Sequence, residues 1–312
     1  MNALLFTLVV FVWGLTWYAI RLELGPVPTE TSIFWRFLVA SAIMWIGLAV
    51  AGRLKRVPLR AHLWFAALGA ALFSCNFLFL YNAERFIASG VVSVVFAMAS
   101  AFNVFNRWLF NGVRPTARTV LGALIGVAGV ALLFADQLAA TAAAGGGSAL
   151  GLLLSIGGTY CFSLGNLASR PAAKAAGDLP NAIARAMTWG AALLAAVVAA
   201  RGLSFAPSTT PIYVGALLYL AAIGSALAFL VYLALVDRIG PERAAYTTVL
   251  SPVIALAISW LLEGYHWSSW ALIGAPLILI GNVVIFLPKF GRAMVRHRLE
   301  SFRTTAAPEE SG

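Results

Sequence analysis

Residues 212–236 read IYVGALLYLAAIGSALAFLVYLALV, without one charged side chain. About 20 apolar residues suffice for a helix to cross a bilayer, and a helix satisfies its own backbone hydrogen bonds there. This stretch is therefore predicted to be a transmembrane helix. In the whole chain of 312 residues, 62% are hydrophobic and 10% charged, whereas soluble domains carry about 25% charged residues. The composition excludes a soluble globule and predicts an all-α polytopic membrane protein.

Ten apolar runs are separated by glycine, proline and charged residues, which commonly end helices. The runs cover residues 3–20, 32–51, 62–81, 86–110, 117–135, 149–168, 181–200, 212–236, 242–262 and 270–287. We therefore expect ten transmembrane helices joined by short loops. The residues that remain are too few for a separate soluble domain.

Lysine and arginine are divided unequally between the two sides of the membrane that ten successive crossings define. Seventeen follow the second, fourth, sixth, eighth and tenth runs, and three lie on the other side, namely Arg21, Arg85 and Arg201. Basic residues are enriched in cytoplasmic loops, so both termini are predicted to be cytoplasmic. The net charge of +10 is explained by these loops, and no nucleic-acid partner is expected.

The second half of the chain repeats features of the first. At shifts of 149 to 152 residues, the matches are Arg36 with Arg185, Tyr81 with Tyr232, Trp108 with Trp260, Gly112 with Gly264, Gly122 with Gly274, and Gly129 with Gly281. We predict a first five-helix repeat over residues 1–136, a second over 149–288, and a basic, then polar, cytoplasmic tail over 289–312. Five is odd, so the repeats are inverted, which suits alternating access around a central cavity.

Several short motifs resemble one transporter family. They are Val12-Trp13-Gly14, Trp35-Arg36-Phe37, Tyr81-Asn82-Ala83-Glu84-Arg85, Gly240-Pro241-Glu242-Arg243-Ala244 and Trp260-Leu261-Leu262-Glu263-Gly264. The chain resembles the EamA branch of the drug/metabolite transporter superfamily, and within it the YddG-type exporters of aromatic and other amino acids. The resemblance implies a multi-pass protein of the bacterial cytoplasmic (inner) membrane that exports metabolites. The first half departs from the pattern where Phe110-Asn111-Gly112 replaces a Gly-Glu signal.

The run 86–110 carries a polar stripe. At 100° per residue, Ser89, Ser93, Phe96, Ser100, Asn103 and Arg107 share one face. Polar side chains facing lipid are costly, so this face meets water or protein. It forms either a cavity wall or a hydrogen-bonded contact between helices.

Other polar and aromatic residues inside the runs are further candidates for substrate contact. Trp13 and Trp17 could offer an aromatic face to a substrate, and Pro252 frees backbone carbonyls near Thr248. Ordinary packing is the alternative for each. The candidate substrate-binding residues are Trp13, Thr16, Trp17, Asn76, Ser93, Phe96, Ser100, Asn103, Tyr160, Ser163, Thr248 and Pro252.

The absence of charge from the middle of the runs restricts the chemistry. No acidic residue lies mid-run, so proton coupling through a central carboxylate is not expected, and an end-of-span group such as Glu84 remains as an alternative. No lysine or arginine lies there to hold a phosphate. No cluster of histidine, cysteine or carboxylate suggests an enzyme, a metal site or a cofactor.

The sequence thus predicts export of aromatic and other neutral amino acids, or similar small metabolites, by alternating access. The alternatives are export of drugs, organic cations or other metabolites, and a non-transporting membrane subunit. Two fused repeats make a monomer plausible.

Overall fold

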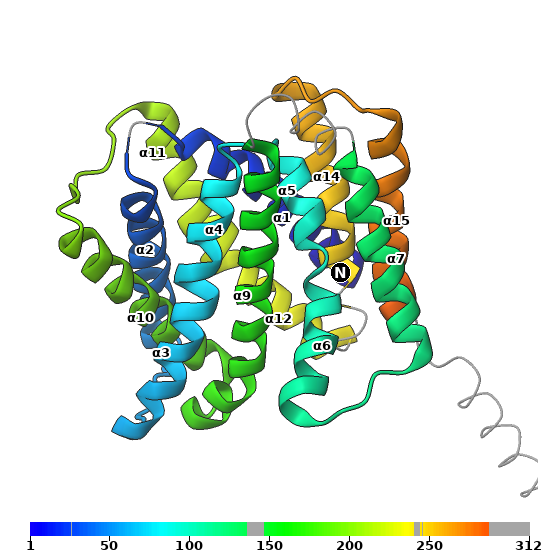
Figure 1. Cartoon of the computed structure of the whole chain (residues 1–312). Coiled ribbons are helices and arrows are strands. Elements are labelled where there is room, and N and C mark those ends of the chain that lie inside the picture. The colour runs from blue at the N-terminus through cyan, green and yellow to red at the C-terminus, as the bar shows by residue number, and fades with distance from the viewer. Residues whose placement is uncertain (26, 136–146, 240–243, 245, 287–312) are drawn as a thin grey trace, which may run out of the picture.

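The computed structural model describes residues 1–25, 27–135, 147–239, 244 and 246–286, and the predicted tail 289–312 lies outside these ranges (Figure 1). All regular structure in the described residues is helical. The helices are α1 (Asn2–Glu23), α2 (Thr29–Val50), α3 (His62–Ala70), α4 (Asn76–Ala83), α5 (Ser89–Phe96), α6 (Ala99–Asn111), α7 (Ala117–Leu133), α9 (Gly147–Ala176), α10 (Leu179–Ala200), α11 (Pro211–Leu218), α12 (Ala228–Ile239), α14 (Tyr246–Leu262) and α15 (Ser269–Phe286), with the short elements η1 (Leu59–Ala61), η2 (Ala71–Cys75) and η3 (Tyr219–Leu227).

These elements form ten crossings, as the sequence predicts. Helices α3 and α4 continue through the wider π-turn η2, and α11 and α12 continue through η3. Seven crossings, counted over the described residues, are long and apolar enough to span a membrane, and Ala117–Leu133, Tyr246–Leu262 and Ser269–Ile285 are shorter apolar helices. The chain is a multi-pass membrane protein.

Two π-turns occupy corresponding places, each in the third crossing of its repeat. The glycines that end matching helices also agree. Gly112 after α6 and Gly264 after α14 both adopt the left-handed conformation, with φ of 67° and 66°. A side chain there would be strained, so the repeat seen in the sequence is a repeat of backbone geometry.

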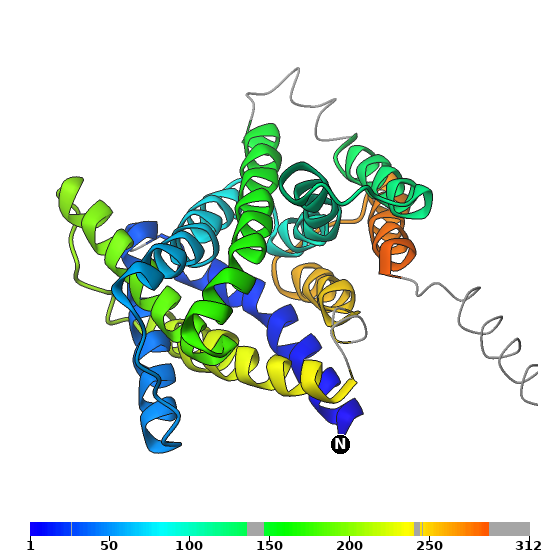
Figure 2. The same cartoon turned by 90° about the horizontal axis from the view of Figure 1, so that it is seen from below.

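Helix packing follows the inverted repeat. Helix α2 packs on α10, α5 on α14 and α7 on α15, so the second, fourth and fifth crossings each contact their own counterpart. Helix α1 contacts α12, which pairs the first crossing of the first repeat with the third crossing of the second. Helix α9 contacts α4, which is the same pairing with the repeats exchanged. Figures 1 and 2 show that the two halves interleave instead of standing side by side.

Glycines allow the closest approach, between α7 and α15. A Cβ added at Gly129 would lie 2.7 Å from the carbonyl oxygen of Gly274, and one added at Gly122 would lie 2.7 Å from that of Gly281. Real Cβ contacts are essentially never under 3.0 Å. The two helix backbones are thus in direct contact, as small residues permit inside membranes.

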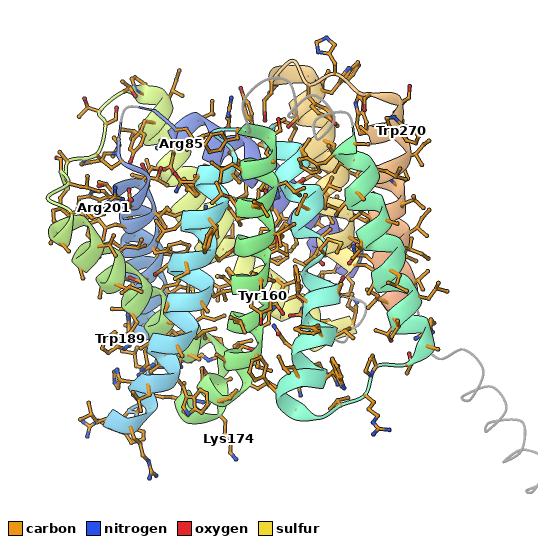
Figure 3. The ribbon with its side chains drawn as sticks, viewed as in Figure 1. Arg85, Tyr160, Lys174, Trp189, Arg201 and Trp270 are labelled. Carbon is orange, nitrogen blue, oxygen red and sulfur yellow. The ribbon has the colours of Figure 1, made fainter. Side chains whose placement is uncertain are left out.

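The bundle has two ends that differ in charge. The basic face contains the α2–α3 and α6–α7 connections and the α9–α10 junction, with Arg53, Lys55, Arg114 and Lys174. The opposite face contains the α1–α2, α4–α5, α10–α11 and α14–α15 connections. Figure 3 places Lys174 at the lower end of the bundle and Arg85 near the upper end.

One helix is longer than the sequence predicts. The apolar run ends at residue 168, but α9 continues through Pro171 to Ala176. The added turns carry Arg170 and Lys174, so hydropathy marks only the part suited to lipid. The helix itself continues to the basic face, where its charged turns line the cavity described next.

Candidate functional site: a polar chamber and a closed opposite face

A chamber of about 1340 Å³ opens at the basic face between α6, α7 and α9. Its described lining includes Trp64 of α3, the segment 113–116 and Ile285 of α15. These elements come from both repeats, so the chamber lies where the two halves meet.

Two polar stripes line the chamber. Helix α6 contributes Ser100, Asn103 and Arg107, and α9 contributes Ser163, Asn166, Arg170 and Lys174. Steps of three and four residues keep each stripe on one helix face. Along both helices, hydroxyls are followed by amides and then by cations towards the basic face. The chamber therefore has a neutral, hydrogen-bonding floor and a positively charged mouth.

The floor is held by a chain of side-chain hydrogen bonds between the two helices. Asn106 Nδ2 donates to Ser163 Oγ at 2.8 Å, and Ser163 Oγ donates to Asn103 Oδ1 at 2.8 Å. Asn166 Nδ2 donates to the same Oδ1 at 3.3 Å. Asn106 Oδ1 is buried and has no partner among the described residues. A buried acceptor of this kind is costly, and this oxygen is closed to the chamber in the present conformation.

An aromatic layer lies at the inner end of the chamber, between its floor and the opposite face. The ring of Phe96 lies 4.6 Å from that of Phe162 and 5.2 Å from that of Trp17, measured between centroids. Trp13, four residues before Trp17 on α1, packs on other rings, 5.1 Å from Tyr232 and 6.1 Å from Phe229. The rings of the layer separate Ser100 from Ser93 along the stripe of α5 and α6.

The structure places three of the predicted residues, Ser100, Asn103 and Ser163, in the chamber lining. The remaining candidates lie outside that lining. Trp17 and Phe96 are in the aromatic layer, and Trp13 packs on Tyr232. The others are Thr16 bonded to Val12 O, Asn76 to Leu72 O, Ser93 to Gly90 O, Tyr160 against Phe102, and Thr248 and Pro252 on α14. Figure 3 shows Tyr160 at mid-height on α9.

The predicted set misses Asn106, which lines the chamber, and Asn282, which lies outside the lining but bonds to Ser100. Asn106 is not on the predicted polar stripe, because it lies to one side of the helix face that carries Asn103 and Arg107. Asn282 of α15 accepts a hydrogen bond from Ser100 Oγ. Its signal was available, since a lone amide in the apolar run 270–287 meets the same criterion that selected Asn76.

The opposite face contains a buried charged network. Tyr81 donates to Glu23 Oε2 at 2.7 Å, and Arg36 donates to the Tyr81 hydroxyl at 3.3 Å and to Ser225 Oγ at 3.2 Å. The Arg36 guanidinium lies 4.4 Å from the centroid of the Phe77 ring. Glu23 and Arg36 are only 1% and 2% exposed. The sequence predicts their positions at span ends, but does not reveal that they are buried.

A second polar contact closes the same face between α5 and α14. Glu263 Oε2 accepts from the Ser89 amide at 3.0 Å, and Ser259 Oγ accepts from the Gly90 amide at 2.8 Å. The Ser89 hydroxyl also donates to Glu263 Oε1. Residues Ser89 and Gly90 belong to the first repeat and Ser259 and Glu263 to the second, so we call this contact the outer seal.

At the basic face, Arg185 occupies the position equivalent to Arg36. Its guanidinium lies 4.8 Å from the centroid of the Trp45 ring and donates to the carbonyl of Lys55. Lys55 Nζ pairs with Asp178 at 2.9 Å. Burial opposes ionisation of Asp178, but hydrogen bonds from Lys55 and Asn181 lower its pKa below the ordinary 3.8. Arg36 and Arg185 therefore anchor opposite ends of the bundle, as the inverted repeat predicts.

Comparison with known proteins agrees with this architecture. The EamA-like transporter family matches residues 1–135 and 149–287, one match in each repeat. "Uncharacterized inner membrane transporter YedA" of Escherichia coli (strain K12) is 26% identical over 280 residues, covering 89% of this chain and 88% of its own.

Two further relatives are named "Probable amino-acid metabolite efflux pump". That of Escherichia coli (strain K12) is 24% identical over 302 residues, covering 93% of this chain and 95% of its own. That of Salmonella typhimurium is 25% identical over 297 residues, covering 91% and 93%. A protein of known crystal structure matches with a TM-score of 0.60 over 96% of this chain and 98% of its own. At 20% identity it shows the fold alone.

Proposed function

The chain belongs to the EamA-like transporter family, and from that premise we propose that it exports neutral amino acids or similar carboxylate-bearing metabolites by alternating access. The family is one of transporters and not of enzymes, and homologues are bacterial inner-membrane transporters. We further propose that the basic face is cytoplasmic, because cytoplasmic loops carry the excess of lysine and arginine. The open chamber then faces the cytoplasm and the outer seal faces away from it.

The charge of the chamber is the observation that carries this proposal. The lining residues that the structure describes include Arg107, Arg114, Arg118, Arg170 and Lys174 and no aspartate or glutamate. A mouth of one charge raises the local concentration of the opposite charge. It therefore favours a solute with a carboxylate and disfavours an organic cation, which is the main alternative within the family.

The neutral floor defines the other end of the solute. The amides Asn103, Asn106 and Asn166 of the lining suit an ammonium or amide donor, and the Phe96–Phe162 pair offers an apolar wall beyond them. A zwitterion with an apolar or aromatic side chain matches both features. This agrees with the resemblance to YddG-type exporters and with the efflux pumps among the relatives.

We also propose that transport is uncoupled from the proton gradient. The described chamber residues offer no carboxylate to carry a proton between the two sides. A pH gradient imposed on proteoliposomes should therefore change no final distribution of solute. Uphill accumulation driven by that gradient would contradict this part of the proposal.

The test is flux through proteoliposomes that contain only this protein. Phenylalanine, its methyl ester and its N-acetyl derivative share a side chain but differ in net charge. We expect the zwitterion and the N-acetyl anion to enter the chamber more readily than the cationic ester. The Arg107→Gln variant should raise KM for the zwitterion by about three- to tenfold, the effect of losing one partly screened charge contact of about 1 kcal/mol.

The matched control is Arg60→Gln, since Arg60 lies in η1 at the same face but outside the chamber lining. It should leave KM unchanged. Equal flux of the ester and the amino acid would refute the choice of substrate. Absence of flux for every amino acid, from protein that remains folded, would refute export itself.

A further inference from the structure

Glu84, at the end of α4, is buried at the opposite face in an arrangement that a carboxylate does not favour. It is 0% exposed, and neither of its side-chain oxygens has a hydrogen-bond partner among the described residues. An ionised carboxylate without partners in a low-dielectric site costs several kcal/mol. In this conformation, the neutral carboxylic acid is therefore the favoured form.

The charged and titratable groups near Glu84 lie on three helices and two connections, while α9, which also packs on α4, carries no titratable side chain in its first turns. They are Arg21 and Glu23 of α1, Arg36 of α2, Tyr81 of α4, Arg85 of the α4–α5 connection and Glu263 after α14. Burial raises the pKa of Glu84 well above its usual range, and the charge of Glu263 adds to that effect, while Arg21 and Arg36 oppose it. Arg21 donates to the backbone carbonyl of Glu84 and not to its carboxylate.

One neighbour of Glu84, Glu263, belongs to the outer seal. Glu263 crosses from the second repeat to the Ser89 amide, five residues after Glu84. Opening this face must separate α5 from α14 and admit water around both carboxyl groups. A hydrated Glu84 would ionise near the ordinary glutamate pKa of about 4.3.

We propose that Glu84 is a proton-binding site at the outer seal and that its protonation keeps this face of the transporter closed. The proton binds more tightly when the seal is closed, so acid on that side favours closure, by linkage. Between the ordinary pKa of glutamate and the raised pKa of the buried Glu84, each unit rise in pH should lower the ratio of closed to open protein about tenfold. Above the raised pKa the ratio no longer changes. Glu84 lies outside the described lining of the chamber, so the proposed site exchanges protons with the opposite face and regulates the rate of transport without driving it.

The experiment measures how fast the opposite face opens, without any substrate. In a background with Cys75→Ala and Cys161→Ala, a Ser93→Cys reporter is treated with an impermeant thiol reagent added to that face. Rates are divided by those of Thr209→Cys, which lies in the exposed 203–210 connection, to remove the pH dependence of the thiol itself. We expect the ratio to fall steeply, up to tenfold per pH unit, as the pH is lowered.

Three variants distinguish proton binding from a structural role. Glu84→Gln, which resembles the protonated form, should label slowly at every pH. Glu263→Gln should move the pH midpoint lower, because it removes a negative charge that favours protonation. Glu30→Gln should keep the wild-type profile, since Glu30 pairs with Arg201 at the same face but away from Glu84.

A wild-type profile in Glu84→Gln would overturn the proposal, as would an unchanged midpoint in Glu263→Gln. Replacement of sodium by choline at constant pH should have no effect, and a strong response would assign the site to a sodium ion instead. Thermal unfolding of each variant in detergent verifies that it is folded. The measurement needs no substrate, so it stands even if the amino-acid flux assay fails.

Discussion

Gly90→Ala is the sharpest test of the outer seal. Gly90 lies in α5 where it crosses α14, and a Cβ there would be 2.7 Å from Leu256 Cα, 2.8 Å from the Ala255 carbonyl oxygen and 2.8 Å from Ser259 Oγ. Two of these atoms are backbone, so no rotamer change can relieve the clash. Separation of the two helices would also lengthen the bond from the Gly90 amide to Ser259.

The size of the effect follows from the clash alone. Overpacking a tight contact costs about 1–3 kcal/mol, whereas the higher helix propensity of alanine stabilises the open and closed conformations equally and does not change their ratio. The closed seal should therefore lose about 1–3 kcal/mol, which changes an equilibrium about five- to 150-fold. Because the clash exists only while α5 and α14 touch, the shift favours opening of the opposite face.

Cysteine accessibility measures this shift on both sides. In the background without Cys75 and Cys161, Gly90→Ala should speed labelling of Ser93→Cys from the opposite face and slow labelling of Ser100→Cys from the chamber. Gly47→Ala is the control, because an added Cβ there meets nothing within 4 Å. If Gly90→Ala labels like Gly47→Ala at both sites, this contact does not close the face and the reasoning is wrong.

Three further predictions concern the scaffold. Gly274→Ala should lower the stability of the fold by about 1–3 kcal/mol in detergent unfolding, because its Cβ would lie 2.4 Å from Leu133 N. This contact belongs to neither face, so the ratio of the two labelling rates should stay unchanged. Asp178→Ala should cost about 1 kcal/mol, since Asp178 caps α10 by accepting from the Asn181 amide at 2.8 Å. Because the pKa of Asp178 is lowered from 3.8, its contribution is present above that pH and is lost as the pH falls further. The wild type should therefore show an acid-dependent loss of melting temperature that Asp178→Ala lacks. Arg36→Met should destabilise the fold by about 3–5 kcal/mol, because it leaves Glu23 and Tyr81 without their cation, and a melting temperature equal to wild type would contradict the buried network.

Much of this molecule could be predicted from the sequence because membranes impose simple constraints. The ten crossings follow from hydropathy, since each must bury its backbone in lipid. The repeat follows from matched positions such as Gly112 with Gly264, which the structure shows in the same left-handed conformation. Three chamber residues, Ser100, Asn103 and Ser163, follow from a polar stripe that lipid would not tolerate.

The tertiary structure decided which neighbours those residues have. A helical stripe cannot show whether its partner is water, another helix or an aromatic ring, so Ser93 and Ser100 look equivalent in sequence but lie on opposite sides of the Phe96–Phe162 layer. Hydropathy likewise places Glu84 at the end of a span, where water is the default expectation. Only the packing of α1, α4, α5 and α14 removes that water, because burial depends on residues far apart in the chain whose contacts no local pattern encodes.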